Sequence, residues 1–175
     1  VKPNVMFFID DSGSMAWNTW NSETPSANND NRMMIVQRAL NKLLVDNKDN
    51  INWGIQTLHD NKRTPARTTV NNSGKITAGR DREIKSWFGV GENQAFTCQT
   101  GNSNYTNSAS ITPKDNKRKH FTDDYELIRK HIACLSPGGG TPANERAKVV
   151  IPYMVDSDNL KNRCQKSYLV MLSDG

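Results

Sequence analysis

The sequence predicts an α/β domain, and three segments carry the prediction. The apolar segment 5–9 ends abruptly at Asp10, as a buried strand does when it delivers polar groups to the rim of an open sheet. Residues 32–47 repeat apolar side chains at helical spacing. The apolar segment 168–172 ends on a second acid, Asp174.

The first half of the chain predicts a strand, a helix and a second strand. The strand at 5–10 is apolar on both faces, so we expect it at the centre of a sheet. The helix at 32–47 can be capped by Asp30 or Asn31. The strand at 51–59 follows it with an alternating pattern.

The second half begins with a polar insertion at about 60–121, where no regular pattern is clear. A helix capped by Thr122 is then expected to run to about residue 135. Another helix opens at Pro142 and runs to about residue 155, kinked or shortened by Pro152. The strand at 166–174 is the last element of what we expect to be a single domain, 1–175.

The composition is polar, with 35% hydrophobic residues and a mean hydropathy of −0.75. No apolar run approaches the roughly 20 residues of a membrane-spanning helix, so no membrane span is expected. The net charge of +5 is concentrated between residues 60 and 120, where eleven Lys and Arg face five Asp and Glu. Such a basic insertion could contact nucleic acid or acidic glycans, but its charges are scattered among Asn, Thr and Ser. We interpret it as a solvated loop and expect no nucleic-acid partner.

Three cysteines, Cys98, Cys134 and Cys164, lack the spacing of a zinc site. One disulfide with an odd thiol fits an extracellular protein, whereas three reduced thiols would fit a cytosolic one. A strand of ten residues would put Cys164 roughly 30 Å from Asp174. Cys134 is expected near the rim of the sheet that holds Asp174, far from Cys164. A direct Cys134–Cys164 bond is therefore disfavoured, and Cys98 with either partner stays open.

The aromatic and imidazole side chains near these segments are assigned structural roles. Trp17 and Trp20 lie in a long loop after the first strand. They could form an aromatic wall for a ligand, but we expect them to clamp the loop onto the domain. His131 has no carboxylate or cysteine at ligand spacing, so we interpret it as a helix residue.

The segment 10–14 has the pattern D-x-S-x-S, which places Asp10, Ser12 and Ser14 two residues apart on a tight turn. One carboxylate and two hydroxyls can then point at one centre. Oxygen ligands of this kind suit a hard cation, Mg²⁺, Mn²⁺ or Ca²⁺.

Two later segments complete a pattern that resembles a known family. Thr141 ends the glycine-rich loop 136–140, and Asp174 ends the last strand in Ser-Asp-Gly. Together with D-x-S-x-S these elements resemble the von Willebrand factor A (vWA) domain and its metal-ion-dependent adhesion site (MIDAS). The resemblance implies a Rossmann-like, mostly parallel sheet flanked by helices. It also implies a sheet that continues after Gly175, so we expect the domain to be incomplete at its C-terminus. The implied metal ligands are the predicted site residues Asp10, Ser12, Ser14, Thr141 and Asp174.

The resemblance implies binding, not turnover. In the family the hydroxyls contact the metal and the acids often act through water, which leaves the cation able to accept a partner's carboxylate. The first strand and the Cys164–Tyr168 segment are similar to the PilC/PilY family of type IV pilus tip adhesins. That similarity implies an extracellular pilus-tip location, with the rest of the adhesin, other tip subunits and surface ligands as partners.

Two alternatives stay open. A vWA-shaped scaffold could assemble with proteins without metal. An aspartic-protease-like hydrolase is suggested by Asp-Ser-Gly-Ser at 11–14, but that chemistry needs two carboxylates that share a proton in an all-β fold.

Overall fold

The computed structural model describes residues 1–24, 30–58, 69–70, 78–91, 94, 96–97, 121–155 and 164–175. Its elements in chain order are β1 (Asn4–Ile9), the 3₁₀ helix η1 (Gly13–Ala16), α1 (Arg32–Asp46), β2 (Asn52–Thr57), β3 (Thr69–Val70), α2 (Ala78–Trp87), β4 (Phe96–Thr97), α3 (Tyr125–Ala133), α4 (Ala143–Val155) and β5 (Ser167–Leu172). Most of the polar insertion predicted at 60–121 lies outside the described residues. The short strands β3 and β4, which fall within it, pair antiparallel.

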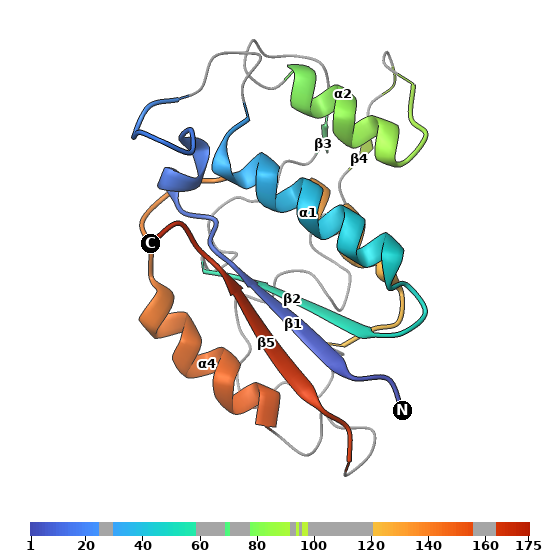
Figure 1. Ribbon diagram of the computed structural model, residues 1–175. Coiled ribbons are helices and arrows are strands. Elements are labelled where there is room, and N and C mark those ends of the chain that lie inside the picture. Colours follow the sequence, from blue (N-terminus) through green and yellow to red (C-terminus); the bar gives the residue numbers. More distant parts are fainter. Residues whose placement is uncertain are drawn as a thin grey trace.

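β1 lies at the centre of a parallel sheet in the order β2, β1, β5 (Figure 1). Ile9 at the end of β1 is opposite Thr57 of β2 and Leu172 of β5, so the three strands end at the same edge. The predicted α/β class and the central first strand are confirmed. The polar residues that follow β1 and β5 therefore emerge next to each other, and the Asp10 amide donates to the Leu172 carbonyl at 2.8 Å.

Helices cover both faces of the sheet, which explains why β1 is apolar from Val5 to Ile9. Phe7 and Ile9 pack with buried residues of α1 and α3, and Phe7 stacks on Trp53 with ring centroids 5.6 Å apart. Met6 and Phe8 pack on the other face with residues of α4, the helix that lies across the sheet from α1 (Figure 1). Alternate side chains of one strand thus fill two separate cores.

β5 is an edge strand of this sheet, because in the described part of the chain it pairs with β1 alone. Its apolar side chains remain accessible: Tyr168 is 49% exposed and Met171 is 50% exposed. Leu169 and Val170 between them are also exposed. β5 therefore presents an open apolar edge, and such an edge favours pairing with a further strand.

The helix caps agree with the sequence at α1 and differ at α3. The Asn31 side chain accepts from the Met34 amide at 2.8 Å, as one of the two expected caps. At α3, Asp124 caps the helix by accepting from the Leu127 amide at 3.1 Å, in place of the predicted Thr122. Thr122 is used differently, because its backbone forms an antiparallel bridge with Trp53 of β2.

α4 contains Pro152 in its last turn and ends at Val155. A proline there removes one N–H donor, yet α4 continues through Pro152 to Val155, the end expected from the sequence. None of the helices in the described part of the chain is long and apolar enough to cross a membrane.

The cysteines follow the geometric expectation. Cys134 is disulfide-bonded, whereas Cys164 is free and exposed. The predicted absence of a direct bond between these two residues is confirmed. Cys98, the third cysteine, lies outside the described residues.

His131 in α3 predicts a loss of stability in mild acid. Burial lowers the pKa of His131 to about 4, from an ordinary value of 6.5. Between these two values the unfolded chain binds a proton that the folded domain does not, so the free energy of unfolding falls as the pH falls. From pH 7 to pH 5 this contribution is about 1–2 kcal/mol.

Denaturant unfolding at pH 7 and pH 5 measures this contribution when the wild-type chain is compared with His131→Gln, which cannot titrate. The wild type should lose more stability over this interval than the variant. Equal losses of stability in the two proteins would contradict the lowered pKa of His131.

Candidate functional site

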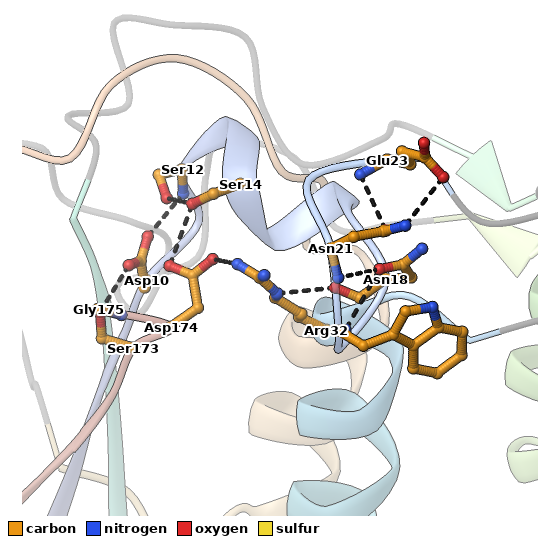
Figure 2. Close-up of polar contacts among 11 residues, drawn as sticks. Asp10, Ser12, Ser14, Asn18, Asn21, Glu23, Arg32, Ser173, Asp174 and Gly175 are labelled. Atoms are coloured by element: carbon orange, nitrogen blue, oxygen red, sulfur yellow. Dashed lines mark hydrogen bonds and ion pairs between the residues drawn. The ribbon is translucent and has the colours of Figure 1, made fainter.

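Asp10 anchors the edge of the sheet where β1 and β5 end. Its side chain is fully buried, and each carboxylate oxygen accepts a hydrogen bond. The Ser12 amide donates to Oδ1 at 2.8 Å, and the Ser173 hydroxyl donates to Oδ2 at 2.8 Å (Figure 2). One carboxylate therefore fixes the turn after β1 and joins it to the segment after β5.

Ser12, Ser14 and Asp174 form a continuous chain of oxygen atoms at this edge. The two serine Oγ atoms lie 3.0 Å apart, and the Ser14 hydroxyl donates to Asp174 Oδ1 at 3.1 Å (Figure 2). Ser12 and Ser14 come from the start of η1, and Asp174 follows β5. The structure thus brings together four of the five predicted site residues, since Asp10 lies directly beneath this chain through the Ser12 amide.

Arg32 belongs to the same cluster and was not predicted. Its Nη1 forms an ion pair with Asp174 Oδ2, on the other oxygen from the one that Ser14 contacts (Figure 2). Its Nε donates to the Asn18 carbonyl at 2.9 Å, and its guanidinium carbon lies 5.9 Å from the centre of the Trp17 ring. Arg32 therefore links the first turn of α1 to the loop after η1 and to the residues after β5.

A sequence signal for Arg32 exists, although it is weak. A cation in the first turn of a helix faces the positive end of the helix dipole, which is unfavourable unless an acid lies nearby. Arg32 occupies the first position of α1. Asp174 supplies the acid, and 142 residues separate the two in the chain.

The loop after η1 is held mainly by Asn18, not by both tryptophans as expected. Asn18 is buried, and its side-chain oxygen accepts from the amides of Trp20 at 3.3 Å and Asn21 at 2.8 Å (Figure 2). Trp17 packs against Arg32, whereas Trp20 is 71% exposed. The expected clamp by Trp20 is therefore wrong. The Asn18 side chain holds the turn instead, by accepting hydrogen bonds from two backbone amides of the loop.

The glycine-rich loop lies against the D-x-S-x-S turn through two backbone hydrogen bonds. The Gly13 amide donates to the Gly139 carbonyl at 2.9 Å, and the Gly138 amide donates to the Asp11 carbonyl at 2.8 Å. A Cβ atom on Gly13 would stand 3.3 Å from the Gly139 oxygen, so a larger residue would push the loop away. Gly139 has a φ of 79°, in the left-handed region that favours glycine.

Thr141, the fifth predicted site residue, lies at the end of this loop and is exposed. Its carbonyl accepts from the Ala143 amide at 2.9 Å, at the start of α4. Among the described residues, its side chain makes no hydrogen bond with Asp10, Ser12, Ser14 or Asp174. The structure therefore places its loop beside the site without placing its hydroxyl in the oxygen chain.

The donor set fits a hard divalent cation. In an octahedral Mg²⁺ site with ligands at about 2.0–2.1 Å, neighbouring ligand oxygens are about 2.9 Å apart. The separations in the chain Ser12–Ser14–Asp174, 3.0 and 3.1 Å, are close to that edge length. Within the described residues no three His, Cys, Asp or Glu side chains gather as a metal-binding group. Ser12, Ser14 and Asp174 would hold the ion directly, while Asp10 would support them from below.

Comparisons with protein-family models, with curated proteins and with solved structures find no match for this chain. The features that bear on its function are therefore the ones the chain itself carries. They are the D-x-S-x-S turn, the glycine-rich loop, the strand end at Asp174, and Arg32.

The glycine-rich loop yields a stability prediction with a matched control. Gly139→Ala should lower the free energy of unfolding by about 1–2 kcal/mol, because a Cβ atom is strained at this φ. Gly140→Ala should lower it by far less or raise it, since a Cβ atom there meets open space and the backbone is not left-handed. Thermal or urea unfolding of the two variants measures the difference. Equal stabilities would show that the loop does not adopt this conformation.

Proposed function

We propose that this chain is a vWA-like domain with a metal-ion-dependent adhesion site, which binds a partner's carboxylate through a divalent cation. The observation that carries the proposal is the convergence of oxygens from two distant segments, Ser12 and Ser14 after β1 and Asp174 after β5, in one hydrogen-bonded chain at the sheet edge. The parallel sheet with helices on both faces is compatible with that domain class. Mg²⁺, Mn²⁺ and Ca²⁺ share the required ligand chemistry.

The charge at the site favours recognition of an acidic ligand. Asp10 and Asp174 supply two negative charges, and Arg32 supplies one positive charge beside them. Asp10 is already bonded at both oxygens, so a bound dication would be only partly neutralised. It would attract an anionic oxygen from outside, such as an Asp or Glu side chain of a partner.

Thr141 would complete the ligand set by a movement of its loop. The glycines at 138–140 are exposed, and two backbone hydrogen bonds hold the loop at the side of the D-x-S-x-S turn. Approach of the Thr141 hydroxyl to the ion would then be linked to ligand binding. This coupling would make the affinity depend on the position of the loop.

We further propose that the domain belongs to an adhesin at the tip of a type IV pilus, outside the cell. The resemblance of its first strand and of the segment Cys164–Tyr168 to the PilC/PilY family supports this assignment. The disulfide at Cys134 supports an oxidising compartment. Surface ligands, pilus tip subunits and the rest of the adhesin would be its partners, with roles in adhesion, pilus biogenesis or surface sensing.

A metal-independent scaffold is the second candidate, and one observation favours it. Arg32 already neutralises Asp174, and hydrogen bonds satisfy both oxygens of Asp10, so the protein stabilises the cluster without an ion. The exposed apolar edge of β5 would serve assembly in either case.

Hydrolysis is the least favoured function. An aspartic-protease mechanism needs two carboxylates that share one proton. Here the Asp10 oxygens accept from Ser12 and Ser173, and the Asp174 oxygens contact Ser14 and Arg32. The α/β sheet also differs from the all-β fold of that class, so we propose binding without turnover.

Calorimetric titration with Mn²⁺ tests the proposal. The wild-type chain should bind one ion, and Ser14→Ala and Asp174→Asn should each weaken binding by about tenfold or more, because each removes an oxygen or its charge from the set. Ser167→Ala is the matched control, since Ser167 starts β5 at the opposite end of the strand. Absence of Mn²⁺ binding to folded wild-type protein, or equal affinity in Ser14→Ala, would contradict the proposal and favour the scaffold.

A further inference from the structure

Arg32 is the best-anchored cation near the oxygen chain. Its backbone amide donates to the Trp17 carbonyl at 3.0 Å, its Nε donates to the Asn18 carbonyl at 2.9 Å, and its Nη1 pairs with Asp174. The side chains of Arg32 and Asp174 are 23% and 8% exposed, so solvent screens their interaction only in part. A guanidinium held by the Asn18 carbonyl and Asp174, on a backbone anchored at Trp17, is a fixed feature of the site, unlike a solvated surface charge.

The two oxygens of Asp174 have different partners. Oδ1 faces the serines and accepts from Ser14, whereas Oδ2 faces Arg32 (Figure 2). A cation bound at the serine side would use Oδ1 and would leave Arg32 in place on Oδ2. The ion and the guanidinium would then share one carboxylate and repel each other across it.

We propose that Arg32 is a built-in counter-cation that weakens the binding of the divalent ion alone and so couples metal binding to the arrival of a carboxylate ligand. This inference rests on the proposed function. With Asp10, Asp174 and Arg32, a bound dication leaves a net charge of +1 at the site. A ligand carboxylate neutralises that charge, so metal and acidic ligand strengthen each other's binding by the same factor. Without Arg32 the site is neutral once the ion is bound, so a ligand carboxylate gains less from the ion and the coupling is weaker.

Arg32 also acts in the metal-free protein. By holding Asp174, it keeps Oδ1 directed at Ser14 and preserves the oxygen chain when no ion is bound. Arg32 is therefore a positioning residue that maintains the geometry of the site while lowering its affinity for free metal.

The test is Mn²⁺ titration of the wild-type chain, Arg32→Gln and Lys42→Gln. Lys42 is the matched control, because it lies on the same helix and pairs with Asp46 on the exposed surface. Both variants remove one positive charge from the protein. Arg32→Gln should bind Mn²⁺ about tenfold more tightly than wild type, and Lys42→Gln should stay within about twofold.

The outcomes separate this inference from the proposed function. Wild-type binding with equal or weaker binding in Arg32→Gln would overturn the inference and leave the proposed function intact. Mn²⁺ binding by Arg32→Gln alone would support the inference and overturn the proposed function for the natural chain. No binding by either protein would overturn both.

A measurement on the wild-type chain covers the case in which Arg32→Gln does not fold. The Nε–Hε resonance of Arg32 can be followed by NMR during titration with diamagnetic Mg²⁺. It should shift saturably, because a second cation on Asp174 alters the charge that Arg32 experiences. An unchanged Arg32 resonance in Mg²⁺-saturated protein would overturn the inference.

Discussion

The buried carboxylate of Asp10 is the contact on which the geometry of this site depends. β1, β2 and β5 run parallel and in register, so the segments after β1 and β5 leave the sheet together. Asp10 joins these two segments through the Ser12 amide and the Ser173 hydroxyl. A buried carboxylate with both oxygens bonded is stable only while those donors stay in place. The positions of the serines and of Asp174 follow from this constraint.

Above Asp10, the site combines attraction for a cation with a cation of its own. The serine hydroxyls and Asp174 offer oxygens at the spacing of metal ligands, and Arg32 offsets part of the negative charge. The same arrangement would stabilise the metal-free domain and make a bound ion dependent on an external carboxylate. Under the proposed function, such a site would recognise an acidic partner reversibly. The exposed edge of β5 is a separate feature. It concerns which strand or partner pairs with that edge of the sheet, and it does not concern the ion.

The sequence predicts those parts of the fold and site that local patterns determine. The apolar run of β1 and the Asn31 cap each appear in a few consecutive residues, and each is confirmed. The last strand is also present, but it ends at Leu172, two residues before Asp174. Arg32 was missed because its partner is 142 residues away and no spacing rule connects them. Thr141 shows the opposite case, in which the sequence motif is clear but the position of the side chain is not. The glycines before Thr141 allow many backbone conformations, so the motif does not fix where its hydroxyl lies. In both cases tertiary contacts, and not local sequence propensity, determine where the side chain lies.

Paramagnetic broadening of backbone amides by substoichiometric Mn²⁺ tests most directly whether three distant segments converge on one ion. Because the effect falls steeply with distance, amides at 12–14, 139–141 and 173–175 should broaden together. Amides at the opposite end of the sheet, such as those of Asn52 and Ser167, should remain sharp. Broadening centred on the surface acids Asp30 and Glu83, with the 12–14 amides unaffected, would contradict the account.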